Sequence, residues 1–102
     1  MNFTQEFDYT GEPLVEYEKY LVVGLEYIPE DIYVLKQYLM HEDGYLEDEL
    51  STDTDVLQAL KDNETYKIIE VNSYHEDNYK EVNESLTDFF NIETKSIKKQ
   101  IA

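Results

Sequence analysis

The run LVEYEKYLVVGLEY at residues 14–27 decides the fold of this chain. It is rich in β-branched and aromatic residues, which favour extended strands. Gly24 interrupts the run, and a glycine within a strand pattern indicates a bulge or the close approach of another segment. The run therefore predicts either one long strand or a hairpin.

A second strand is predicted at residues 65–74, TYKIIEVNSY. Two sets of side chains alternate along it, as they do on the two faces of a strand. One set is Lys67, Ile69, Val71 and Ser73, and the other is Tyr66, Ile68, Glu70 and Asn72. We expect this strand to pair with the first run.

A helix is predicted to begin at Pro29. Proline is favoured at the first helical position, and the acids that follow it suit the positive end of the helix dipole. The helix is expected to continue to about Met40 and to end at the Asp43-Gly44 turn. One face of it would carry Ile28, Ile32, Leu35 and Leu39.

Two further helices are predicted. Thr52 or Asp53 would cap a short helix that ends at Asp62-Asn63 and turns Val56, Leu57 and Leu60 inward. Asp77 or Asn78 would cap another that runs to about Phe90, with apolar residues at heptad-like spacing. These apolar residues are Tyr79, Val82, Leu86 and Phe89.

The predicted elements define the fold class and the domain organisation. They give a single α+β domain with a small antiparallel sheet and about three helices. We expect residues 1–12 to form an N-terminal arm or an edge strand and residues 13–92 to form the acidic α+β domain. Residues 93–102 would be a C-terminal tail that bears lysines.

Negative charge dominates the composition. The chain has 102 residues, 24 acidic and 8 basic side chains, and a formal net charge of −16. Spreading this charge over a sphere of the size of the domain gives a self-energy of about 10 kcal/mol at physiological salt. That energy is comparable with the stability of a whole domain, about 5–15 kcal/mol. A charge that opposes folding to this extent suggests a use in binding, although solubility alone would also account for it.

The composition argues against catalysis and against a cofactor or metal. The three glycines, Gly11, Gly24 and Gly44, are isolated, so no phosphate loop is present, and the chain has no arginine and no cysteine. His41 and His75 lie far apart, without a second histidine at ligand spacing. We therefore expect no enzyme activity, no catalytic residue, no metal and no cofactor.

The same composition bears on location and on direct partners. No apolar run approaches the length of a membrane span, and the acidic start MNFTQEFDYTGEP is unlike a signal peptide. We expect a cytoplasmic protein, monomeric or homodimeric, that does not contact a membrane. Direct binding to nucleic acid requires a basic face, and the only lysine cluster is Lys95, Lys98 and Lys99. We expect no binding to DNA or RNA.

Two groups of acids are candidate partner-binding residues. On the helix predicted at residues 77–90, acids recur every three or four residues, which places them on one face about 5–6 Å apart. They are Asp77, Glu81, Glu84 and Asp88. The second group lies between the first two helices and comprises Glu42, Asp43, Glu47, Asp48, Glu49, Asp53 and Asp55, of which Glu47, Asp48 and Glu49 are the candidate contact residues. Leu46 and Leu50 are the apolar residues that could anchor this segment. Rows of carboxylates can occupy a groove that normally holds phosphates.

Tyrosine is the second compositional signal. The chain has ten tyrosines, four phenylalanines and no tryptophan. Because each buried hydroxyl needs a partner, we expect some tyrosines to lie on the surface and to contact other proteins. Those most expected to be exposed are Tyr33, Tyr45 and Tyr74.

In composition the whole chain resembles the DNA-mimic inhibitors of phages and mobile elements. These include anti-CRISPR proteins, antirestriction proteins and uracil-DNA glycosylase inhibitors. Like them, the chain is small, acidic, rich in tyrosine and free of cysteine. No motif of a single family accompanies the resemblance. It implies stoichiometric inhibition of a basic nucleic-acid-binding enzyme, such as a nuclease, whose groove the acidic surface would occupy.

Two alternatives use the same electrostatics. The chain could be an immunity or antitoxin protein that blocks a basic nuclease toxin without imitating nucleic acid. It could instead be an acidic regulatory adaptor with no inhibitory role. Both alternatives share the expectation of a basic protein partner.

Overall fold

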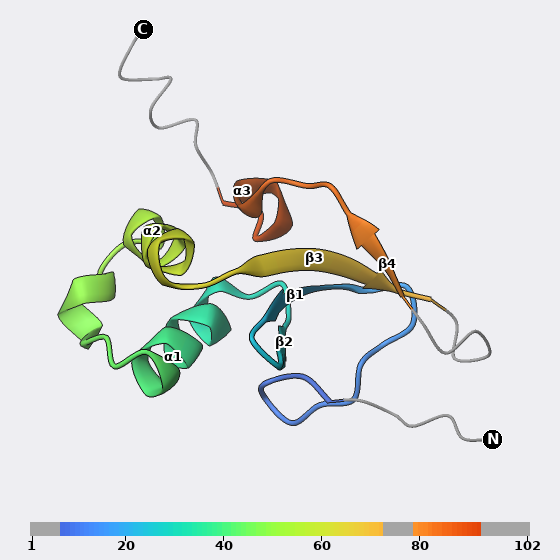
Figure 1. The fold of residues 1–102 in the computed structure, drawn as a ribbon, viewed down its shortest axis with the longest axis horizontal. Helices are drawn as coiled ribbons and strands as arrows, with labels where there is room; N and C mark the ends of the chain where they lie inside the picture. Colours follow the sequence, from blue (N-terminus) through green and yellow to red (C-terminus); the bar gives the residue numbers. More distant parts are fainter. Residues whose placement is uncertain (1–6, 73–78, 93–102) are drawn as a thin grey trace, which may run out of the picture.

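In a computed structural model of the chain, the structure describes residues 7–72 and 79–92. Eight elements follow one another in the order β1 (Lys19–Val23), β2 (Glu26–Ile28), α1 (Ile32–Glu42), the 3-10 helix η1 (Glu47–Leu50), α2 (Asp53–Asn63), β3 (Tyr66–Val71), β4 (Tyr79–Val82) and α3 (Leu86–Phe89). The strands form one antiparallel sheet in the order β2-β1-β3-β4. Helices α1, η1 and α2 gather at one end of the molecule, and the sheet extends away from them (Figure 1). The predicted α+β class with a small antiparallel sheet is confirmed.

The run at residues 14–27 forms a hairpin, the second of the two predicted forms. Val23 lies opposite Glu26, which leaves Gly24 and Leu25 as the two turn residues. Gly24 has φ +59°, and a positive φ at the first turn residue favours glycine. A Cβ at Gly24 would lie 3.1 Å from the Tyr38 hydroxyl, so the predicted close approach is also present, against α1.

Helix α1 begins at Ile32, three residues later than predicted. Asp31, rather than the proline, sets its start: the Asp31 carboxylate accepts a hydrogen bond of 3.0 Å from the Tyr33 backbone N–H. Ile28, assigned to the helix by its spacing, belongs to β2 instead. The helix ends at Asp43, and Gly44 follows with φ +78°, as the Asp43-Gly44 signal predicted.

Helix α2 matches its prediction closely. Thr52 is the N-cap, and its hydroxyl accepts a hydrogen bond of 3.1 Å from the Asp55 N–H, while the Asp55 carboxylate accepts one from the Thr52 N–H. This reciprocal arrangement satisfies two backbone donors at the start of the helix. The predicted apolar face, which includes Val56 and Leu60, is buried.

The helix predicted at residues 77–90 is wrong. Residues 79–82 form β4, which pairs with the open edge of β3. Within the described residues 79–90, Leu86–Phe89 are helical, with Ser85 as the N-cap, and the predicted cap at Asp77 or Asn78 lies outside the described residues. The apolar spacing misled the prediction because a strand followed by a short helix fulfils it as well. Val82 reaches the core from the sheet, and Leu86 and Phe89 reach the same core from α3.

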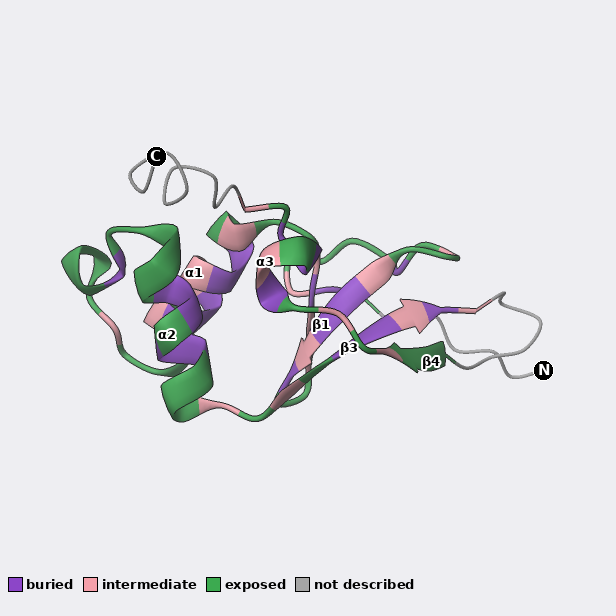
Figure 2. Cartoon of the chain, turned by 90° about the horizontal axis from the view of Figure 1, so that it is seen from above, coloured by how far each residue is buried: buried purple, intermediate pink, exposed green. Residues whose placement is uncertain are grey.

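The sheet has apolar residues on both faces. On one face the main core joins strand residues such as Leu21 and Ile68 to residues of α1, α2 and α3. Figure 2 shows the buried surfaces of α1 and α2 turned towards each other and the exposed surfaces turned outward. The other face has a smaller cluster, formed by Leu14, Tyr20, Ile69 and Val71. No helical residue belongs to this second cluster among the residues that the structure describes.

Residues 7–13 form a loop that packs beside β2. Phe7 bridges to Pro13, and the Tyr9 N–H donates to the Tyr27 carbonyl at 2.8 Å. Within the loop, the Asp8 carboxylate accepts hydrogen bonds from the Thr10 N–H at 2.8 Å, the Thr10 hydroxyl at 2.6 Å and the Glu12 N–H at 3.2 Å. Asp8 is 9% exposed, so this part of the N-terminal segment is anchored to the domain.

Candidate partner-binding surface

The acidic row predicted on a single helix does not exist, because its residues lie on different elements. Glu81 is in β4, Glu84 is in the connection that follows, and Asp88 is in α3. Asp77 lies outside the described residues, as does Tyr74. The spacing of three and four residues therefore does not place these carboxylates on one face.

Lysines accompany the acids at the end of the sheet that includes Glu84. The Glu84 carboxylate accepts a hydrogen bond of 3.0 Å from the Lys19 ammonium, and this bond raises the pKa of Lys19. The strand register also places Lys19, Glu70 and Lys80 opposite one another across β1, β3 and β4. Opposite charges alternate here, so this region is a poor imitation of a phosphate row.

The other predicted acidic group lies at the helical end of the molecule, where negative charge is concentrated. Residues 31–64 carry ten carboxylates and two lysines. Nine of these carboxylates belong to exposed residues. Seven of the nine lie close together in sequence, on the end of α1, on η1, at the start of α2 and in the turns between them: Glu42, Asp43, Glu47, Asp48, Glu49, Asp53 and Asp55. They extend from residue 42 to residue 55, around the end of the molecule that is farthest from the sheet (Figure 1).

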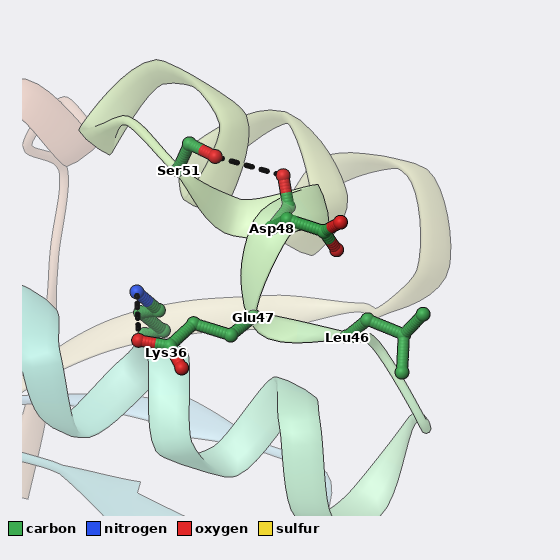
Figure 3. Close-up of a pocket in the computed structure, with 5 residues that line it drawn as sticks. All are labelled: Lys36, Leu46, Glu47, Asp48 and Ser51. Carbon is green, nitrogen blue, oxygen red and sulfur yellow. Dashed lines mark hydrogen bonds and ion pairs between the residues drawn. The ribbon is translucent and has the colours of Figure 1, made fainter.

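Two adjoining hollows lie between α1 and the segment formed by η1 and the start of α2. One, of about 650 Å³, is open and is lined by Lys36, Leu46, Glu47, Asp48 and Ser51 (Figure 3). The other, of about 170 Å³, is lined by Ile32, Tyr33, Lys36, Leu50, Ser51, Thr52, Asp53 and Val56. The two share Lys36 and Ser51, and we call the combined feature the acidic groove.

The acids around the groove have different tasks. Glu49 turns back to accept a hydrogen bond of 2.8 Å from the Leu46 N–H, so it caps η1. Asp55 is held in the capping box of α2. Glu47 approaches the Lys36 ammonium at 3.8 Å, a loose ion pair in which the Glu47 side chain is 79% exposed. Figure 3 shows the Glu47 carboxylate turned towards Lys36 and the Asp48 carboxylate turned away from it.

Asp48 and Asp53 are the acids best placed to contact a partner. Both are exposed and both line the groove. In Asp48 only the backbone carbonyl is engaged locally, by the Ser51 hydroxyl at 2.7 Å. Their carboxylates can therefore pair with a cation of a partner without breaking a cap.

Apolar side chains are exposed at both ends of the groove. Tyr33 is 62% exposed, as predicted, and Leu46 is 64% exposed, contrary to the expectation that it anchors the loop. Leu50 provides that anchor and is 1% exposed. Tyr45 differs from its prediction: it is half-buried against the main core, and its hydroxyl accepts a hydrogen bond from the Asn63 side chain.

Burial and nearby acids raise the pKa values of two groups beside this surface, Glu64 and Tyr38. Burial raises the pKa of the Glu64 carboxyl, and a hydrogen bond with Asp43 and the charge of Asp43 raise this pKa further. Burial, followed by repulsion from Glu64 and Asp43, raises the pKa of Tyr38 to about 12. In both groups burial is the largest cause, and the charges of nearby carboxylates add to it.

Within residues 7–72 and 79–92, no three side chains of the types His, Cys, Asp and Glu are arranged to hold a metal ion. No helix in this part of the chain is long and apolar enough to cross a membrane.

Comparison with protein-family models, with curated proteins and with solved structures gives no match for this chain. Sequence reasoning singled out Glu47, Asp48, Glu49 and Tyr33 at this surface. It missed the roles of Lys36, Leu46 and Ser51, because only the packing of η1 over α1 brings these three together.

Proposed function

We propose that the chain is a stoichiometric protein inhibitor that binds the basic nucleic-acid groove of an enzyme and displaces the nucleic acid. The observation that carries the proposal is the acidic groove, where exposed carboxylates outnumber lysines and stand between two exposed apolar side chains. Carboxylates steer a basic partner and set its orientation, whereas Tyr33 and Leu46 supply contact area. The compositional resemblance to anti-CRISPR, antirestriction and glycosylase-inhibitor proteins supports the same class.

The proposed contact includes fewer acids than the set predicted from the sequence. Glu81, Glu84 and Asp88 no longer form a row, and Glu84 is engaged by Lys19. The proposed contact is therefore centred on Asp48, Asp53, Glu47 and Tyr33. Because Glu49 and Asp55 maintain helix caps, changes at those two residues would confuse stability with binding.

The test is a competition measurement on basic nucleic-acid-binding enzymes. A panel would include a guide-RNA nuclease, a restriction enzyme and a uracil-DNA glycosylase, together with basic proteins captured from a bacterial lysate. Each enzyme is titrated with labelled nucleic acid in the presence and absence of the chain. We expect the chain to raise the apparent dissociation constant for nucleic acid of at least one enzyme, and to do so less as salt increases.

Variants locate the contact. The double variant D48K/D53K is expected to weaken inhibition about tenfold or more, because each charge contact contributes about 0.2–1 kcal/mol and reversal adds repulsion. The matched control reverses two exposed acids away from the groove, E12K/D88K, and should change inhibition far less. A partner that binds the chain and its nucleic acid together, without mutual loss of affinity, would contradict displacement and favour an adaptor. Inhibition of a toxin nuclease without competition would favour the immunity-type alternative.

A further inference from the structure

A second surface lies on the sheet face opposite the helices. In antiparallel strands, residues directly opposite each other point to the same face. The register therefore places Tyr20, Ile69 and Glu81 together, Val22 with Lys67 and Tyr27, and Val71 with Tyr79. We call this surface the open sheet face. Leu14, from the segment before β1, joins its buried cluster from outside the strands.

Large apolar side chains are exposed on and beside the open sheet face. Tyr79 is 44% exposed on β4, and Val15 and Tyr17 are 52% and 64% exposed in the segment that leads into β1. Val22 and Tyr27 remain half-exposed above the buried cluster. Exposed apolar groups that gather on one side of a small protein typically mark a contact with another protein.

The backbone conformation at Tyr17 supports a role for its exposed ring in contacting a partner. The Tyr17 N–H donates to the Val71 carbonyl at 2.7 Å, and the Val71 N–H donates to the Glu18 carbonyl at 3.0 Å. Tyr17 and Glu18 thus face the single residue Val71, which is the arrangement of a β-bulge. Bulges redirect side chains. Tyr17 has φ +68°, a conformation that usually selects glycine. The chain keeps an exposed aromatic ring at a strained position, where glycine would fit better.

The charge of the open sheet face differs from that of the rest of the molecule. The charged residues that the strand register places there are Lys67 and Glu81. The Lys67 ammonium lies 5.8 Å from the centre of the Tyr79 ring. On the strands, this face is therefore formally neutral, in a chain with a net charge of −16.

We propose that the open sheet face is a two-fold interface with a second copy of this chain. A two-fold axis that passes between Lys67 and Glu81 sets Lys67 of each copy opposite Glu81 of the other, so the pair of charges is self-complementary. The apolar residues Val15, Tyr17 and Tyr79 then become buried between the copies. A basic partner is drawn to the acidic groove instead, because the two charged strand residues of the open sheet face, Lys67 and Glu81, balance each other.

Pairing of two copies through the free edge of β4 is the competing arrangement. A two-fold axis perpendicular to the sheet leaves the same face of both copies on the same side, so each β4 residue is opposed by one that points to the same face. Centring the axis on Lys80 or Glu81 sets like charges directly opposite each other, which destabilises a strand pair. Centring it on Tyr79 or Val82 avoids this repulsion but leaves the apolar side chains of the open sheet face uncovered.

The test is analytical ultracentrifugation of the full chain up to near-millimolar concentration. We expect a reversible dimer, and we expect K67E and E81K each to raise its dissociation constant about tenfold or more. In either single variant, like charges oppose each other twice. The double variant K67E/E81K should restore the dimer, because the opposite charges face each other again. Failure of the double variant to recover would overturn the two-fold arrangement.

Two further variants separate loss of contact from loss of folding. Tyr17→Gly removes the ring and fits the positive φ, so the folded monomer should persist while the dimer weakens. Tyr33→Ser, at the acidic groove, is the matched control and should leave the dimer unchanged. Added salt should strengthen the dimer, since it screens the repulsion between two chains of charge −16, but should weaken inhibition. A chain that stays monomeric throughout, or a dimer indifferent to Tyr17→Gly and K67E, would overturn the proposal.

Discussion

Individual carboxylates in this chain have different structural roles, although the sequence presents them as one acidic population. Asp8 and Asp31 accept backbone hydrogen bonds, Glu84 pairs with Lys19, and Asp48 is exposed in the acidic groove. The fold raises the pKa of Glu64, because burial and the nearby Asp43 oppose ionisation of this carboxyl. A carboxyl of that kind makes stability depend on pH.

The variant Glu64→Gln tests how much the ionised Glu64 carboxylate destabilises the folded protein. The folded-state pKa of Glu64 is raised above its ordinary value of 4.5, so the folded protein holds this proton to higher pH than the unfolded chain. The contribution of Glu64 to stability therefore falls as pH rises from about 4 through the raised pKa. We expect Glu64→Gln to stabilise the protein at neutral pH by about 0.2–1 kcal/mol, and the gain to vanish below about pH 4.

Thermal or urea unfolding at several pH values measures the effect of Glu64→Gln. Glu12→Gln, in an exposed loop, is the matched control and should show no such dependence. An equal effect of both variants, or destabilisation by Glu64→Gln at neutral pH, would mean that the surroundings of Glu64 do not oppose its ionisation.

At the scale of elements, short segments are held by side chains that satisfy backbone groups. The 3-10 helix η1 depends on Glu49, helix α2 on Thr52, and the loop at residues 7–13 on Asp8. Each of these elements is too short to be stable in isolation. Their positions follow from capping and from packing against the sheet.

The loop at residues 7–13 gives a test at this scale. Asp8→Ala removes the acceptor of three hydrogen bonds, and we expect a loss of about 1–2 kcal/mol of unfolding free energy. Asp8→Asn keeps a carbonyl oxygen in the same place and should lose much less. Chemical unfolding followed by tyrosine fluorescence measures both variants. Equal stability of Asp8→Ala and the natural chain would show that the loop does not contribute to the fold.

At the scale of the whole molecule, net charge opposes the compact state. Among the described residues, the two ion pairs within 4.0 Å are Lys19–Glu84 and Lys36–Glu47. Most carboxylates therefore have no cation at contact distance in this part of the chain. Repulsion among them is relieved only by screening or by a basic partner.

We expect the folded protein to become more stable as salt rises. Raising sodium chloride from about 10 mM to about 500 mM shortens the screening length from about 30 Å to a few Å and should raise the melting midpoint by several degrees. Scanning calorimetry at low protein concentration separates this effect from dimer formation. A lower midpoint in high salt would indicate that attractive ion pairs dominate, contrary to the charge distribution described above.

The sequence alone is enough to predict extended structure at residues 14–27 (one strand or a hairpin), helix α2 with its cap at Thr52 or Asp53, a strand within residues 65–74, and the excess of negative charge. Local signals carry these features: β-branched runs, the Thr52 cap, and the glycines at the two turns. The secondary structure of residues 79–89 depends on tertiary contacts. Their apolar spacing suits a helix or a strand followed by a helical turn, and the free edge of β3 selected the strand by pairing with it. Only the packing of η1 over α1 assembled the acidic groove, and only the strand register brought Lys67 and Glu81 onto one face, because contacts between residues distant in sequence leave no local pattern.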